Sequence, residues 1–180
     1  SGHQFEQFSN SYPRSEKAED AAFLAAVSYA KVAPVHSIDQ EGTDKALDKF
    51  QVFVERFPNS EKLPEANRYI AELQNKLERK AYEIAYNYYK VEDYRSAIVA
   101  LDNFIQDYPG TPFREKALYY RLESAYILAS NSVTSKQQER FITAKAAYSN
   151  LVKAFPNSEY RAKADQRLAE IEKGLQQFSK

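Results

Sequence analysis

Few side chains in this sequence are of the kinds that carry out catalysis or hold metal ions. The 180 residues include two histidines and no cysteine, which excludes a thiolate nucleophile, thiolate metal sites and disulfides. His3 lies close to the first residue, and His36 stands near Asp39 and Glu41, where a weak metal site or a solvated loop histidine fits the residues. Motifs for phosphate-binding loops, zinc proteases and serine hydrolases are absent. We therefore expect a protein that is not an enzyme, with no catalytic residues, no metal site and no cofactor.

Tyrosines show the pattern best suited to binding. The chain has 14 of them, and Tyr82, Tyr86, Tyr89 and Lys90 recur at the spacing i, i+4, i+7 and i+8, which places them on one face of a helix over about 79–90. Tyrosine combines a large contact area with a polar tip and a small loss of side-chain entropy. We expect these four residues to line a groove that contacts a partner protein or an extended peptide. The alternative is that the rings pack on an adjacent helix with their hydroxyl groups in water.

Neighbouring positions complete this interpretation. The other face of the same helix, with Ala81, Ile84, Ala85 and Tyr88, is expected to point into the core. Tyr119, Tyr120 and Tyr126 extend the aromatic surface, with two of the three expected in the core. A groove for C-terminal carboxylates would need several basic and amide side chains, so the tyrosines favour it less.

These side chains must be positioned by a repeated helical scaffold. An aromatic residue followed by proline and then by a small or polar helix starter occurs four times, with the prolines at Pro13, Pro58, Pro109 and Pro156. Proline stops the preceding helix, and the serine or threonine two residues later is expected to be the N-cap of the next helix, namely Ser15, Ser60, Thr111 and Ser158. Self-similarity at a period of 45 to 51 residues indicates a repeat architecture.

Each proline is preceded by the apolar stripe of a helix. Alanine lies twelve residues before three of the prolines, and large apolar side chains lie eight, five and four residues before them. The first copy is partial: Phe5 and Phe8 hold the corresponding places before Pro13. The sequence is therefore expected to begin inside a helix whose partner helix lies upstream.

The pattern predicts helices over 3–11, 15–32, 43–57, 60–90, 92–108, 112–130, 136–155 and 159–178 in a single domain, 1–180. The longer connections, Pro34 to Gly42 and Ser130 to Ser135, are candidate contact sites, and Ser135 with Gln138 forms a capping-box motif. Lys and Arg together equal Asp and Glu at 25 each, so the charge balance predicts no nucleic-acid partner. No apolar run approaches the roughly 20 residues of a membrane-spanning helix.

The segment from Ala81 to Pro109 resembles a tetratricopeptide repeat. Ile84-Ala85-x-x-Tyr88 is followed by Asp93-Tyr94-x-x-Ala97-x-x-x-Leu101-x-x-Phe104 and then by the proline. The spacing is longer than that family's usual repeat, and Phe53, Phe104 and Leu151 replace a small residue. The resemblance implies an all-α, tetratricopeptide-like solenoid of about four antiparallel helix pairs.

Longer strings narrow the resemblance to the later repeats of the BamD family of outer-membrane assembly lipoproteins. They include Phe57-Pro-Asn-Ser60, Asp107-Tyr108-Pro109-Gly110-Thr111, and the stretch 59–89, in which the last helix of one repeat runs into the first helix of the next. This resemblance implies a scaffold subunit on the periplasmic face of the bacterial outer membrane, lipid-anchored through a cysteine upstream. Its implied partners are the periplasmic repeats of the barrel-forming assembly protein and unfolded outer-membrane proteins. The alternatives are another periplasmic tetratricopeptide adaptor of the cell envelope, or an accessory repeat domain of an envelope enzyme.

Overall fold

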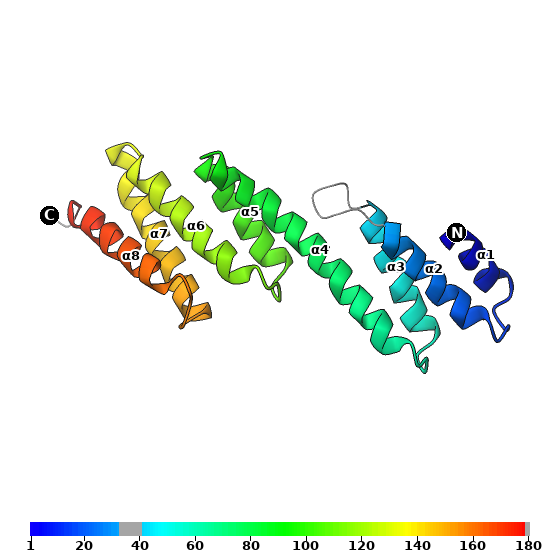
Figure 1. Ribbon diagram of the computed structural model, residues 1–180. Helices are drawn as coiled ribbons and strands as arrows, with labels where there is room; N and C mark the ends of the chain where they lie inside the picture. The colour runs from blue at the N-terminus through cyan, green and yellow to red at the C-terminus, as the bar shows by residue number, and fades with distance from the viewer. Residues whose placement is uncertain (33–40, 179–180) are drawn as a thin grey trace. The chain divides into compact units, whose positions relative to one another are not determined.

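The computed structural model describes residues 1–32 and 41–178, and this part of the chain folds into eight α-helices with no strand. They are α1 (Gly2–Ser11), α2 (Ala18–Val32), α3 (Glu41–Arg56), α4 (Leu63–Lys90), α5 (Tyr94–Asp107), α6 (Arg114–Ser130), α7 (Thr134–Ala154) and α8 (Arg161–Gln176). The tetratricopeptide-like, all-α helical-repeat fold is confirmed, and every predicted helix is present (Figure 1). His36 and most of the predicted loop from Pro34 to Gly42 lie outside the described residues.

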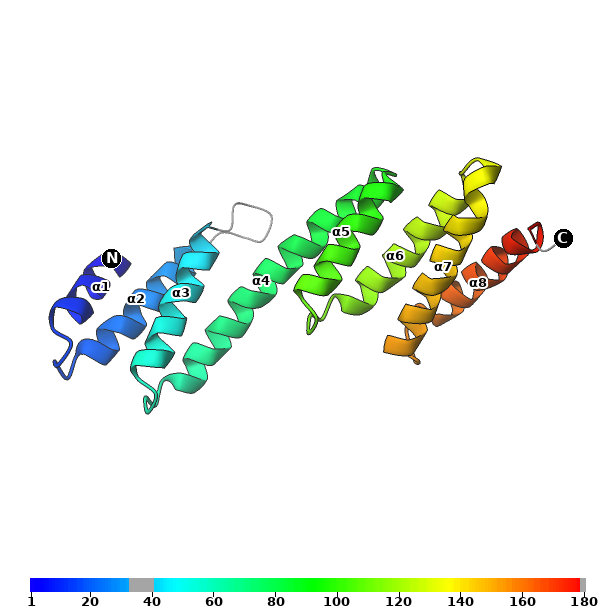
Figure 2. The same ribbon diagram turned by 180° about the vertical axis from the view of Figure 1, so that it is seen from behind.

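The helices form two compact units, Ser1–Lys80 and Ala81–Lys180. In the first unit α1 packs on α2 and α2 on α3; in the second, α5 packs on α6, α6 on α7, and α8 on both α6 and α7. The same neighbours are seen from the opposite side (Figure 2). The first unit has one cluster of buried apolar side chains and the second has two. The single domain expected over 1–180 stays a prediction.

Each of the four proline corners is a hydrogen-bonded β-turn. At the second corner the Phe57 N–H donates to the Phe53 carbonyl at 2.9 Å and ends α3, and the Ser60 N–H donates to the Phe57 carbonyl at 3.1 Å. Proline fits the second position of such a turn because its φ is already near the required value. The same two bonds recur at the other three corners.

The serine or threonine of each corner acts one turn earlier than predicted. The Ser60 hydroxyl accepts from the Lys62 N–H at 3.0 Å, and Ser15, Thr111 and Ser158 accept from the N–H two residues on in the same way. Regular helix starts three residues after the serine or threonine, at Ala18, Leu63, Arg114 and Arg161. The prediction that these residues are the N-caps of α2, α4, α6 and α8 was therefore wrong, since they cap the turn that leads into each helix.

The apolar stripes form the cores as predicted. Before the three later prolines, Pro58, Pro109 and Pro156, the residues twelve and five positions earlier are 3% exposed or less, with Phe53, Phe104 and Leu151 at the latter position. Full burial of a side chain of this size stabilises the fold by roughly 1.5–3 kcal/mol. The residues four before the same three prolines, including Ile105, are only half-buried.

The first copy of the stripe is exposed, and one expectation about a helix start was wrong. Phe5 and Phe8 are 38% and 37% exposed: the preceding helix covers Phe53 with Phe23 and covers Phe104 with Tyr82, and no described residue does this for Phe8. The capping box at Ser135 does not form, because α7 begins at Thr134 and has no side-chain cap.

The corner between α4 and α5 has no proline and uses a different device. Glu92 adopts φ 63°, the Glu92 N–H donates to the Tyr89 carbonyl, and the Asp93 N–H donates to the Tyr88 carbonyl, both at 3.0 Å. This is a Schellman motif with glutamate in the left-handed position that usually favours glycine. Asp93 then caps α5 by accepting from the Ser96 N–H at 3.1 Å. The motif fixes where α4 ends and therefore where Lys90 lies.

Candidate functional site: a tyrosine groove in the second unit

Three of the four predicted binding residues line one cavity. Tyr82, Tyr86 and Lys90 border a space of about 470 Å³ together with Glu83, Asn87, Lys116, Tyr120 and Tyr160. We call this cavity the tyrosine groove. Tyr89, the fourth predicted residue, does not line it, and lies beside it with its ring 4.9 Å from the Tyr120 ring.

The walls of the groove are built from stacked rings. Tyr82 and Tyr86 come from successive turns of α4 and stack at 5.8 Å with 5° between their planes, and Tyr86 stacks on Tyr89 at 5.7 Å. Tyr120 of α6 meets Tyr86 at 4.5 Å. Side chains four residues apart on a helix lie one above the other, so α4 presents a ladder of rings and α6 closes its side. Aromatic pairs of this kind contribute about 0.5–1.5 kcal/mol beyond the area they bury.

The face of α4 that points into the core differs from the prediction. Tyr82 and Ala85 are buried, at 7% and 3% exposure, whereas Ile84 is 50% and Tyr88 is 41% exposed. The prediction that Ile84 and Tyr88 face the core was therefore wrong. The stacking of Tyr82 on Phe113 at 5.4 Å and its contact with Phe104 rotate the buried stripe toward the tyrosines.

The buried edge of the groove anchors its exposed edge. Tyr82 packs with Leu101, Phe104 and Ala117 in one apolar cluster, while Tyr86 is half-buried and Lys90 is exposed. The Lys90 ammonium lies 5.5 Å from the centre of the Tyr86 ring, a cation–π contact. The groove thus runs from a buried apolar floor to an exposed charged rim.

Burial holds the phenol groups in their neutral form. It raises the pKa of Tyr119 and of Tyr160 to about 12 and raises the pKa of Tyr82 further, because the charged phenolate would be poorly solvated there. Burial and a bond to Tyr86 likewise raise the pKa of Tyr120. At neutral pH these hydroxyl groups can both donate and accept hydrogen bonds.

A partly buried ion pair links α6 and α8. Glu123 of α6 is 4% exposed and accepts two hydrogen bonds from Arg167 of α8, at 2.8 and 3.0 Å. The Arg167 guanidinium also lies 4.7 Å from the centre of the Tyr126 ring. Glu123 lies four residues beyond Tyr119, so the pair stabilises the helix that carries both Tyr119 and Tyr120.

Several lining residues were not singled out from the sequence. Tyr160 stacks on Tyr119 at 4.3 Å and comes from the corner before α8. Its place four residues after Pro156 matches that of Phe113 after Pro109, so alignment of the corners is a signal that predicts it. Lys116 carries no such signal, because its sequence neighbours resemble those of any exposed helical lysine.

The groove is lined by phenol, ammonium, amide and carboxylate groups. Within residues 1–32 and 41–178, no group of three or more histidine, aspartate or glutamate side chains could hold a metal ion. In the same part of the chain, no helix has both the length and the apolar character that crossing a membrane requires. Stacked phenols beside Lys90 and Lys116 can bind a peptide by ring contacts, hydrogen bonds and attraction of carboxylates.

Comparison with known proteins agrees with this architecture. A family model named YfiO and described as "Outer membrane lipoprotein" matches residues 2–85 and 78–178, nearly the whole chain. The chain belongs to this family. Among curated members related to it, "Outer membrane protein assembly factor BamD" of Neisseria meningitidis serogroup B is 27% identical over 135 residues, which are 71% of this chain and 45% of that protein.

A second relative has the same name and comes from Haemophilus influenzae. It is 25% identical over 145 residues, which are 76% of this chain and 50% of the relative. The chain spans about half the length of the curated relatives it matches. The resemblance to the BamD family is confirmed.

Proposed function

We propose that this protein is a non-enzymatic scaffold subunit of the machinery that assembles β-barrel proteins in the bacterial outer membrane. Membership of an outer membrane lipoprotein family supports this, as do relatives named as outer membrane protein assembly factors. The observation that carries the proposal is the tyrosine groove, a preformed binding surface on a chain of that family. A position on the periplasmic face, held by a lipid anchor upstream of this sequence, accompanies the proposal.

The groove suits an extended or partly ordered protein segment. Its rings present flat apolar surface with polar tips, and no described residue forms an ion pair with Lys90 or Lys116. A segment that combines aromatic or apolar side chains with a carboxylate would satisfy both features. The periplasmic domains of the barrel-forming assembly protein and unfolded outer-membrane proteins are the partners we propose.

The test is site-specific crosslinking in the native host. The full-length protein receives the photoreactive residue p-benzoylphenylalanine in place of Tyr86, which lines the groove. The matched control carries it in place of Tyr88, a tyrosine of the same helix that is 41% exposed and lies outside the groove. Irradiation of whole cells and mass spectrometry then identify the adducts.

We expect adducts at position 86 with a barrel protein that carries repeated periplasmic domains, or with unfolded barrel proteins, and few at position 88. Adducts only with unrelated envelope proteins would contradict the assembly role while leaving the groove as a binding site. Equal yields at both positions would contradict the groove itself. A Tyr86→Ala variant that keeps its fold should lose about tenfold in partner affinity, the scale of one aromatic hot spot.

A further inference from the structure

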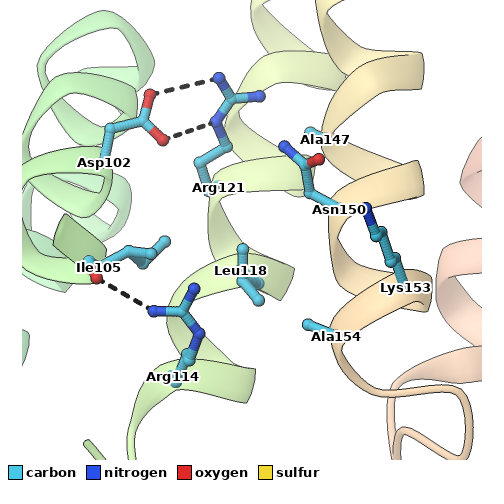
Figure 3. Close-up of a pocket in the computed structure, with 9 residues that line it drawn as sticks. All are labelled: Asp102, Ile105, Arg114, Leu118, Arg121, Ala147, Asn150, Lys153 and Ala154. Carbon is cyan, nitrogen blue, oxygen red and sulfur yellow. Dashed lines mark hydrogen bonds and ion pairs between the residues drawn. The ribbon is translucent and has the colours of Figure 1, made fainter. Parts of the chain in front are cut away.

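A second cavity in the second unit lies away from the tyrosines, among α5, α6 and α7. Its volume is about 410 Å³, its floor includes Leu118, and three cations border it: Arg114, Arg121 and Lys153 (Figure 3). The one acidic side chain on its walls, Asp102, accepts two hydrogen bonds from Arg121, at 3.0 and 3.2 Å. We call this cavity the open notch.

The first unit has a cavity at the same place in its repeat, and there side chains of the protein itself narrow it. Glu6 stands seven residues before its corner proline, as Asp102 does, and pairs with Lys49 of α3 at 2.9 Å. Arg56 near the end of α3 donates to the Ser9 carbonyl at 2.8 Å and to the Ser9 hydroxyl at 3.1 Å. These two cations reach from α3 across to α1, and the space left is about 190 Å³.

In the second unit the same groups are bonded from a different helix. The Ile105 carbonyl, four residues before its proline like Ser9, accepts from Arg114 at 3.0 Å. Arg114 belongs to α6, where the first unit has Ala18, and the place of Arg56 is taken by Ala154. With both guanidinium groups on α6, no long side chain of α7 crosses to α5, and the notch stays open (Figure 3).

The result is an excess of positive charge on preformed walls. Arg114 is bonded to a backbone carbonyl and to no carboxylate of the described residues, and none of these residues forms an ion pair with Lys153. Arg121 is held by Asp102 with its side chain 15% exposed. Guanidinium groups fixed by their own hydrogen bonds bind a carboxylate with little further loss of entropy.

We propose that the open notch binds an acidic side chain of a partner protein, with an apolar neighbour of that side chain resting against Leu118. The carboxylate lies between Arg114 and Lys153. An acidic peptide segment fits better than a phosphate group because the apolar floor lies beside the cations. This site is separate from the tyrosine groove and does not depend on the assembly role.

The test uses a hexapeptide of alternating glutamate and leucine, blocked at both ends and labelled with a fluorophore, with a glutamine–leucine peptide as its control. Binding is followed by fluorescence anisotropy, and the arginine side-chain N–H signals are followed by NMR. We expect the glutamine peptide to bind at least tenfold more weakly and the Arg114 signal to shift with the acidic peptide only.

Three variants locate the bound peptide. Ala154→Arg fills the notch as Arg56 does in the first unit and should weaken binding at least tenfold. Lys153→Gln removes one exposed charge and should weaken it about threefold to fivefold, whereas Lys163→Gln, an exposed lysine of α8, should leave it unchanged. All three sites are at the surface, so circular dichroism should show unchanged folding.

Two results would overturn the proposal. One is loss of peptide binding in Tyr86→Ala with none in Ala154→Arg, which would place the peptide in the tyrosine groove. The other is a shift of the Arg114 signal by phosphatidylglycerol vesicles and not by the acidic peptide, which would make the notch a lipid headgroup site.

Discussion

The two units use one helical repeat with different side chains on the corresponding faces. Ten residues after its first corner proline, Pro13, the first unit has Phe23, and ten residues after Pro109 the second has Tyr119. At the next position, Leu24 corresponds to Tyr120. Leu24 borders an apolar cavity of about 450 Å³ with Phe5 and Phe8, and Tyr120 borders the tyrosine groove. The same backbone therefore presents an apolar surface in one unit and a polar-tipped surface in the other.

The helix that carries the polar surface of the second unit also has a buried charged side chain, which needs a partner. Fourteen residues after the proline, Val27 of the first unit corresponds to Glu123 of the second, and both are buried. A buried carboxylate is strongly destabilising unless it is paired, and Arg167 of α8 provides the partner. The difference between the units shows that a few side chains on the first helix of a pair decide the chemistry of this surface. Where one of them is a buried carboxylate, a neighbouring helix must provide its partner.

Breaking the Glu123–Arg167 ion pair should have the largest effect on the free energy of unfolding. Arg167→Ala leaves the buried Glu123 carboxylate unpaired and should lower the free energy of unfolding by about 3 kcal/mol. The double variant Glu123→Val with Arg167→Met installs the pattern of the first unit and should be nearly neutral. Urea unfolding followed by circular dichroism measures both. A double variant as unstable as Arg167→Ala would contradict the account of the pair.

The next largest effect is expected at high pH, where the second unit should lose stability before the first. Burial raises the pKa of Tyr119 and of Tyr160 to about 12, above the ordinary value near 10. The folded state therefore holds more protons than the unfolded state between pH 10 and 12, and stability falls as pH rises through this window. The loss is about 2 kcal/mol for Tyr119 alone.

The first unit should be affected less by the same change. Tyr29 also has a raised pKa, through burial and its bond to Glu6, and bonds to carboxylates raise the pKa of Lys45, Lys49 and Lys62. These groups lie outside the buried core, and Phe23, at the position of Tyr119, has no group to titrate. Hydrogen exchange resolved by mass spectrometry at pH 9 and pH 11 should show α6 and α8 losing protection before α2 and α3. Simultaneous loss in both units would contradict a role for the groove phenols.

Exchanging phenylalanine and tyrosine at the corresponding positions 23 and 119 should have an intermediate effect on stability. Phe23 contacts Phe53 at 5.4 Å and Phe50 at 6.1 Å, so the hydroxyl of Phe23→Tyr would enter an apolar cluster. We expect a loss of about 1–2 kcal/mol in the free energy of unfolding. The reverse exchange, Tyr119→Phe, should cost under about 1 kcal/mol. Equal costs in thermal unfolding would mean that the two environments are alike.

The smallest effect is expected at the corner between α4 and α5. Glu92 has φ 63°, a conformation that glycine adopts without strain. Glu92→Gly should raise the free energy of unfolding by about 0.5 kcal/mol, since relief of strain is partly offset by the greater freedom of glycine in the unfolded chain. Glu92→Ala is the control: it removes the charge without relieving the strain and should bring no gain in melting temperature.

The repeat and its corners could be predicted because they depend on neighbours along the chain. Proline at each corner ends one helix whatever surrounds it, and an apolar stripe such as Ala97, Leu101 and Phe104 is buried in any helix pair. Three of the four predicted residues line the same cavity for the same reason, since helical spacing fixes which side chains share a face. The buried side of α4 was not predicted correctly, because Ile84 and Tyr82 are both apolar enough to lie in a core.

By itself the sequence determined the all-α helical repeat, the positions of its corners and the ladder of tyrosines on one helix, all of which follow from spacing and backbone chemistry. Only the tertiary structure decided which face of α4 is buried and that Lys116 and Tyr160 join the groove. It also decided that Arg114 donates to the Ile105 carbonyl, which corresponds to the Ser9 carbonyl that Arg56 bonds in the first unit. These choices depend on which helices meet and at what distance. Long arginine and tyrosine side chains can reach several partners, so their contacts are fixed by packing and not by spacing along the chain.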